Sequence, residues 1–225
     1  MRLTLIRHGQ TPSNVEHHLD TAVPGPGLTA LGREQAAALP GALGAEPIDA
    51  VFASNLVRTQ LTAAPLAAAL KLPVEVREGL REISAGELEM RNDREAILAY
   101  LKTIYRWVSG ETEVRMPGGP DGASTLARFD DVVAELSSAG LRSPVVFSHG
   151  AIIRAWATSR AANVGADFIV RNALSNTGIA VLEAADVPGG GLGLWQLLTW
   201  MGEPVGGESL EDFGEDGPAA EDVRL

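Results

Sequence analysis

The chain has 225 residues, of which 45% are apolar; this is enough to bury one substantial core and leaves little room for a second domain. It contains no cysteine, which excludes disulfides, a thiolate nucleophile and cysteine-ligated zinc or iron–sulfur sites. The net charge of −11 argues against nucleic acid as a partner, because a phosphate backbone binds clustered lysine and arginine. No stretch approaches the length of a membrane span or of a signal-peptide core, so we expect a cytoplasmic protein that binds no membrane.

The first half of the chain predicts short strands that alternate with helices. The segments 29–43 and 56–70 are rich in alanine and have helical spacing of apolar residues, and Pro40 is expected to end or bend the first of them. Short apolar runs are typical of buried strands. Three such strands are expected at residues 3–7, 50–53 and 74–76.

The second half continues this alternation. Asn92 with Glu95 three residues later is typical of a capping box, and it predicts the start of a helix that reaches Val108. Glycines and prolines then interrupt the chain before a second amphipathic helix. The remaining elements are expected in the order strand 145–147, helix 151–161, strand 178–182, a glycine turn at 189–191, and strand 194–200.

This alternation predicts an α/β fold, a three-layer sandwich with a mostly parallel central sheet and helices on both faces. We expect one domain over residues 1–201, with a helical insert at about 90–122 that lies over the ligand site. Residues 202–225 hold eight acidic residues against one arginine and few apolar residues, so a disordered tail is expected there. Ligands of such sheets bind at the carboxyl ends of the strands.

His8 directly follows the first predicted strand, and Gly9 begins the turn into the next helix. The amino end of a helix favours an anion such as phosphate, and Arg7 adds a planar fork of donors that suits phosphate oxygens. His149 repeats this placement after the strand at 145–147. For either histidine alone, an ordinary structural residue at a strand end is the alternative.

Two further residues complete a candidate site. Arg58 lies in the first turn of a predicted helix, where the helix dipole disfavours it unless an anion lies nearby; a surface salt bridge is the alternative. Glu82 stands in the loop after the third strand. A histidine nucleophile, several cationic groups and a carboxylic acid are the groups that phosphoryl transfer needs.

The order of these motifs resembles the histidine phosphatase superfamily, which is also called the phosphoglycerate mutase-like family. The similarity extends over residues 3 to about 183, nearly the whole predicted domain. It is carried by four motifs, which are Leu5 to Thr11 with Asn14, Ser54 to Thr59, Leu80 to Glu82, and Ser148 to Gly150.

The resemblance implies a role for each matching position. His8 would form a phosphohistidine, and Arg7, Arg58 and His149 would bind the phosphoryl group and stabilise its charge. Glu82 would donate the proton to the leaving group. The substrate contacts would be Asn14, Gln10, Thr11 and Gly150. The resemblance implies neither a metal nor a cofactor, because the arginines and histidines supply the positive charge.

Three groups of residues leave alternatives open. Glu87 or Glu89 could serve as the acid in place of Glu82. His17 and His18 lie near two acidic residues and could suggest a metal site, although adjacent residues on a helix do not face the same way. Three arginines of the insert could contact the rest of the substrate or could pair with nearby acids; these are Arg91, Arg94 and Arg106.

The sequence favours the phosphatase branch of the family. Sugar-phosphate mutases carry Trp-Asn after the first motif, whereas this chain has Pro12-Ser13-Asn14. We therefore expect a hydrolase of a small phosphomonoester, with a mutase-type phosphotransferase or a non-catalytic module that binds a phosphorylated ligand as alternatives. A homodimer stays open, because Trp195 and Trp200 could lie in the core or at an interface.

Overall fold

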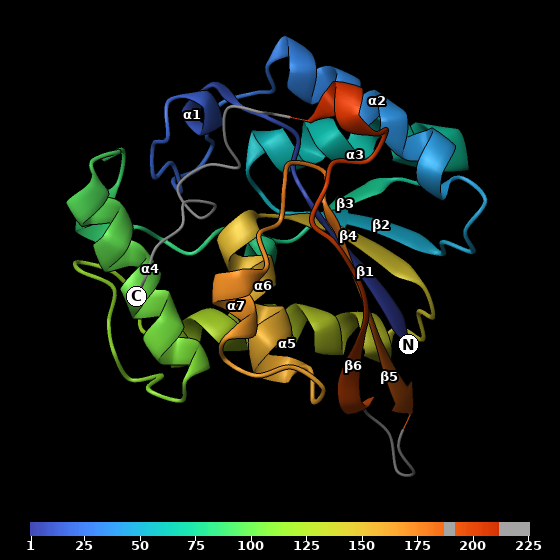
Figure 1. Cartoon of the computed structure of the whole chain (residues 1–225). Coiled ribbons are helices and arrows are strands. Elements are labelled where there is room, and N and C mark those ends of the chain that lie inside the picture. Colours follow the sequence, from blue (N-terminus) through green and yellow to red (C-terminus); the bar gives the residue numbers. More distant parts are fainter. Residues whose placement is uncertain (187–191, 212–225) are drawn as a thin grey trace.

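The computed structural model describes residues 1–186 and 192–211, which form a six-stranded sheet between two layers of helices (Figure 1). The strand order is β3-β2-β4-β1-β5-β6; the first four strands are parallel, and the last two are antiparallel to their neighbours. The predicted three-layer fold with a mostly parallel sheet is thus confirmed. The strands are β1 (Arg2–Arg7), β2 (Ala50–Ala53), β3 (Val74–Val76), β4 (Pro144–Ser148), β5 (Ile179–Asp186) and β6 (Leu192–Met201).

The helices divide between the two faces of the sheet. Two helices cover one face, and four lie on the side of the other (Figure 1). The first pair is α2 (Ala30–Leu43) and α3 (Val57–Leu70); the others are α4 (Arg94–Val108), α5 (Gly122–Ser138), α6 (Gly150–Arg160) and α7 (Phe168–Arg171). The short helix α1 (Pro12–Val15) and the 3-10 turns η1 (Glu78–Leu80), η2 (Gly86–Leu88) and η3 (Glu208–Leu210) complete the described elements.

Alternation along β1 explains why it lies in the middle of the sheet. Leu3 and Leu5 pack into one core cluster with Trp156, whereas Ile6 packs into the other with Leu39 of α2. Successive side chains of a strand point to opposite faces, so a strand with apolar residues on both faces is buried on both. The predicted turn at 189–191 lies outside the described residues.

Two helix boundaries differ from the sequence predictions. Asp93 caps α4, because its side chain accepts a hydrogen bond from the Ala96 N–H, while the Asn92 amide donates to the carbonyl oxygen of Glu16. The helix α2 continues past Pro40 to Leu43, so of the two expected effects of Pro40, an end or a bend, the end is excluded. A proline removes only one N–H from the helical ladder, and packing of the flanking turns can compensate for this loss.

The segment 202–211 packs against the domain, which corrects the prediction that a disordered tail begins at residue 202. Val205 is only 3% exposed and belongs to the core cluster beneath α2 and α3. The Gln35 side-chain amide donates to the Leu210 carbonyl oxygen at 2.9 Å. Two apolar residues therefore anchor an otherwise polar segment; residues 212–225 lie outside the described part.

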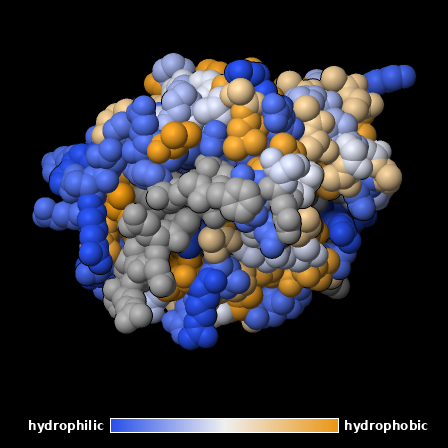
Figure 2. All heavy atoms as spheres, turned by 45° about the horizontal axis from the view of Figure 1, so that its top comes forward, coloured by the Kyte–Doolittle hydropathy of each residue, from blue (hydrophilic) through white to orange (hydrophobic). Residues whose placement is uncertain are grey.

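The two tryptophans of β6, Trp195 and Trp200, pack against aromatic side chains of the described fold. Trp195 is buried, with its ring centroid 5.6 Å from that of Trp156, so it belongs to the core. Trp200 is half-buried against Phe168. Hydrophobic residues lie in several separate groups among hydrophilic ones on the face shown in Figure 2. Within the described ranges, no helix is both long enough and apolar enough to span a membrane.

Candidate active site

The two histidines predicted from the sequence meet at one edge of the sheet. β1 and β4 are parallel neighbours in which Arg7 pairs with Ser148, so the next residue of each strand is a histidine. The His8 N–H donates to the Ser148 carbonyl oxygen at 3.1 Å, and the ring centroids of His8 and His149 are 5.2 Å apart. The carboxyl ends of the strands therefore carry the candidate site, as expected.

A cavity of about 70 Å³ opens at this edge. A water molecule needs at least about 10–15 Å³ on this measure, so the cavity can hold several waters or one phosphate group. It is lined by Arg7, His8, Thr11, Ser13, Asn14, His18, Leu19, Asp20, Thr21, Arg58, Glu82, Tyr100, Gly150, Ala151, Arg154, Ala173 and Leu174.

The ring of His8 is held in one tautomer. Its Nδ1 lies 2.8 Å from the Gly9 carbonyl oxygen, which can only accept, so the proton lies on Nδ1 and the lone pair on Nε2. Burial lowers the pKa of His8 well below its usual value, and the charges of Arg58 and Arg7 lower it further, against the opposing effect of Gly9. His8 is therefore neutral near pH 7, with one nitrogen available to attack.

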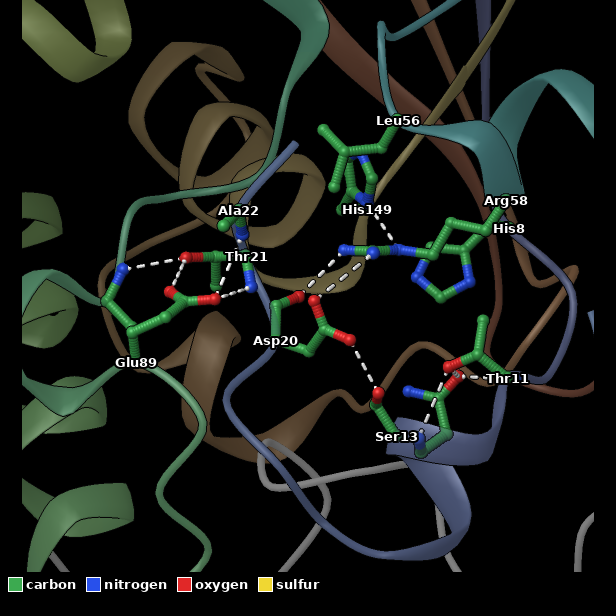
Figure 3. Close-up of polar contacts among 12 residues, drawn as sticks. His8, Thr11, Ser13, Asp20, Thr21, Ala22, Leu56, Arg58, Glu89 and His149 are labelled. Atoms are coloured by element: carbon green, nitrogen blue, oxygen red, sulfur yellow. Dashed lines mark hydrogen bonds and ion pairs between the residues drawn. The ribbon is translucent and has the colours of Figure 1, made fainter. Parts of the chain in front are cut away.

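His149 lies behind the cavity wall rather than in it. Its Nδ1 accepts a hydrogen bond of 3.3 Å from the Arg58 Nε–H (Figure 3). Its Nε2 lies 2.7 Å from the Ser54 hydroxyl. Burial, then Arg58 and His8, lower the pKa of His149 well below its usual value. The structure therefore places the His149 ring against Arg58, and His149 is not among the residues that line the cavity.

Arg58 is buried, which excludes the alternative of a surface salt bridge. Its Nη2 donates to the Asp20 carbonyl oxygen at 2.9 Å, while Nη1 lies 3.9 Å from the Asp20 carboxylate and has no hydrogen-bond partner among the described residues. Burial lowers the pKa of Arg58, and nearby carboxylates, Asp20 first, oppose this shift. A buried cation with an unsatisfied N–H is suited to an anionic ligand.

Glu82 is held at the amino end of α6. One of its oxygens accepts from the Ile83 and Ile152 N–H groups at 2.8 and 2.9 Å, and the other accepts from Ala151 at 3.1 Å. Arg128 of α5 fixes the loop from behind, because it donates to the carbonyl oxygens of residues 79, 81 and 82 at 2.6 to 2.9 Å. Glu82 thus has a fixed position in the cavity that His8 also lines.

The comparisons with known proteins agree with this geometry. The sequence profile of the histidine phosphatase superfamily (branch 1) matches residues 3–190. The chain belongs to this superfamily. The motifs that carried the resemblance all lie within the matched residues.

Relatives of this chain include several phosphatases. The adenosylcobalamin/alpha-ribazole phosphatase of Escherichia coli K12 is 33% identical over 61% of this chain and 67% of that protein. A mycobacterial glucosyl-3-phosphoglycerate phosphatase, solved in complex with VO3, is 27% identical and superposes with a TM-score of 0.72 over 89% of this chain and 98% of that one. Probable phosphoglycerate mutases are also similar.

A longer relative contains the match as a part. The PE-PGRS family protein PE_PGRS11 of Mycobacterium tuberculosis is 40% identical over 92% of this chain, and the match spans 38% of that protein. This chain therefore spans about two fifths of the length of that relative.

The predicted substrate contacts divide into two groups. Asn14 and Thr11 line the cavity and bind each other in the capping box of α1, where the Thr11 N–H donates to Asn14 Oδ1 at 3.0 Å. Gly150 lines the cavity at the start of α6. The Gln10 side chain instead accepts from the Thr29 hydroxyl at 2.6 Å, near the start of α2, and Gln10 does not line the cavity, so its substrate contact stays a prediction.

The alternative acids and arginines lie elsewhere. Glu89 binds the backbone of residues 21 and 22, and Glu87 does not line the cavity, so Glu82 keeps the role of candidate acid. Arg91 pairs with Asp93 and Arg106 with Glu111 at the exposed surface. None of the three arginines of the insert lines the cavity.

The structure brings residues into the cavity that the sequence did not indicate. Arg154 lies one helical turn after Gly150, and this spacing could have indicated it. Asp20, Ser13 and Tyr100 come from a loop, from α1 and from α4, and no local signal marks them. Over residues 1–186 and 192–211, no cluster of three or more histidine, aspartate or glutamate side chains could hold a metal ion.

Replacement of Arg128 by methionine is expected to reduce kcat about tenfold for an alkyl phosphate and less for p-nitrophenyl phosphate. Arg128 orients the loop of Glu82, and only a poor leaving group needs the proton that Glu82 would supply. The measurement is kcat for both esters, with Arg106→Met as a surface control. An equal loss for both esters would show that Arg128 has a structural role only.

The two buried histidines should make stability depend on pH. Since both pKa values are lowered in the folded protein, the unfolded chain binds more protons once the pH falls below about 6.5. Stability is therefore complete above this pH and is lost as the pH falls, by up to about 2 kcal/mol per histidine between pH 6.5 and 5. Urea unfolding should show a smaller loss for His149→Gln than for the wild type; identical pH dependence would contradict the prediction.

Proposed function

We propose that this protein is a phosphomonoester hydrolase that acts on a small phosphorylated metabolite through a phosphohistidine at His8. The observation that carries the proposal is the buried, neutral His8, with Nδ1 engaged and Nε2 available, in one cavity with Arg7, Arg58 and Glu82. The named phosphatases among the relatives support this activity. We propose a small phosphomonoester as the partner of this protein. The homodimer stays a prediction.

In the first step, Nε2 of His8 attacks the phosphorus atom, and the bond between phosphorus and the leaving oxygen breaks. The electron pair goes to the leaving oxygen, which takes a proton from Glu82. Arg7 and Arg58 stabilise the charge on the transferring group.

In the second step, the Glu82 carboxylate takes a proton from a water molecule. The resulting oxygen attacks the phosphohistidine, the bond between phosphorus and Nε2 breaks, and phosphate and neutral His8 are released. Both arginines act again in this step. The proposed steps need no metal ion, so full activity is expected after treatment with a chelator, and inhibition by the chelator would contradict this.

Rapid quenching with radiolabelled p-nitrophenyl phosphate tests the intermediate. Acid-labile label should appear on the wild-type chain within the first turnover and should map to the peptide that contains His8. A label that is absent, or that is stable to acid and attached elsewhere, would overturn the mechanism.

The mutase is the second candidate, because probable phosphoglycerate mutases are among the relatives. A mutase returns the phosphoryl group to another hydroxyl of its substrate, whereas a hydrolase gives it to water. With 3-phosphoglycerate and 2,3-bisphosphoglycerate present, we expect release of phosphate to be faster than isomerisation. The opposite order would make the protein a mutase.

A further inference from the structure

A second carboxylate, that of Asp20, lines the same cavity, and the proposed mechanism leaves it without a role. The Ser13 hydroxyl donates to its Oδ2 at 2.5 Å. Its Oδ1 lies 3.9 Å from Arg58 Nη1, which is too far for a hydrogen bond (Figure 3). The Asp20 side chain is 11% exposed. A partly exposed acceptor is thus available to a ligand in the cavity.

The backbone around Asp20 holds this carboxylate in place. Arg58 donates to the Asp20 carbonyl oxygen, and the Asp20 N–H donates to that of His18 at 2.9 Å. Glu89 accepts from the N–H groups of Thr21 and Ala22 at 2.7 and 2.9 Å and from the Thr21 hydroxyl (Figure 3). The loop cannot withdraw Asp20 without breaking these bonds, so its carboxylate is a fixed feature of the cavity wall.

The cavity wall carries cationic side chains beside His8 and a carboxylate at Asp20. The phosphate group lies at His8 with Arg7 and Arg58, so the rest of the ester must extend along the remaining wall. That wall includes Asp20 and Ser13. A carboxylate of the leaving group near Asp20 would be repelled in this partly buried place, whereas a hydroxyl could donate to Oδ1.

We propose that Asp20 selects phosphomonoesters whose leaving group is an uncharged, hydroxyl-bearing alcohol and disfavours those whose leaving group carries a carboxylate. This inference rests on the proposed phosphatase function. Arg154 also lines the cavity and is the residue that would give the opposite preference. Its Nη2 already donates to the carbonyl oxygen of Ile169.

Two esters that differ at one group test the inference. Glycerol 3-phosphate and 3-phosphoglycerate share the phosphate and the carbon chain, and a terminal hydroxymethyl group in the first replaces the carboxylate of the second. The wild type should have a kcat/KM at least about tenfold higher for glycerol 3-phosphate. Asp20→Asn removes the charge but keeps an oxygen for Ser13, and it should lower this preference about tenfold or more.

Control variants separate charge from other effects. Asp20→Glu retains the charge and should retain the preference. Asp93→Asn removes one charge from an exposed helix cap outside the cavity and should leave the preference unchanged. Any effect of these substitutions on Arg58 acts on both esters, because both carry the same phosphate, and it cancels in the ratio.

The outcomes distinguish this inference from the proposed function. A preference that is equal in the wild type and in Asp20→Asn, or a wild type that prefers 3-phosphoglycerate, overturns the role of Asp20. If the wild type hydrolyses neither ester nor p-nitrophenyl phosphate, the phosphatase function is wrong. In that case calorimetry measures the affinity of each ester for the same variants. The ratio of the two affinities then decides the role of Asp20.

Discussion

His8→Ala is expected to lose at least about 10⁴-fold in kcat, because the proposed covalent step depends on its Nε2. The loss should be similar for alkyl and aryl esters, since both need the nucleophile. Steady-state phosphate release and rapid quenching together measure it. The labelled intermediate should be absent from the variant.

His18→Ala is the matched control for this experiment. His18 lines the same cavity, but its Nδ1 lies 3.2 Å from the Glu16 carboxylate at the rim, and the mechanism does not use it. This variant should form the intermediate. If His8→Ala retained full turnover, or if His18→Ala lost the intermediate while His8→Ala kept it, the assignment of the nucleophile would be wrong.

Glu82→Gln is expected to reduce kcat by about 10² to 10³-fold for an alkyl phosphate. The amide has no proton to give to an alkoxide and cannot take one from water. The loss in the first step should be much smaller for p-nitrophenyl phosphate, whose leaving group departs without a proton. The dependence of kcat on the leaving group should therefore become steeper in the variant.

A separate measurement tests whether Glu82→Gln changes the stability of the fold. An amide has only one oxygen for the three N–H groups that Glu82 now binds, so thermal unfolding should be measured together with kcat. Glu87→Gln changes a carboxylate in the same loop outside the cavity and should leave both kcat and its dependence on the leaving group unchanged. An equal loss for both classes of ester in Glu82→Gln would remove Glu82 from the role of acid.

Much of the site follows from local sequence patterns. Short apolar runs predict β1 and β4, and the polar residues directly after them must lie at the edge where the carboxyl ends of parallel strands meet. For this reason the sequence alone predicts that His8 and His149 lie close together. The sequence places the candidate acid in one loop, but the choice of Glu82 over Glu87 and Glu89 depended on the resemblance.

Other features depend on contacts between residues far apart in the chain. Gln10 follows His8 by two residues, yet its side chain turns to Thr29, because the turn and the start of α2 pack together. Asp93 rather than its neighbour caps α4, since the adjacent amide is engaged by a distant loop. Segment 202–211 packs because α2 and α3 offer an apolar surface that composition alone does not reveal.

The sequence by itself determined the order of the elements and the family, because these depend on periodicity and on the motifs next to strand ends, and it indicated His8 as the candidate nucleophile. Only the tertiary structure decided that His149 lies behind Arg58 and that Asp20 stands in the wall of the cavity. The physical reason is that hydrogen bonds between loops, such as those from Glu89 to residues 21 and 22, fix positions that no local pattern encodes.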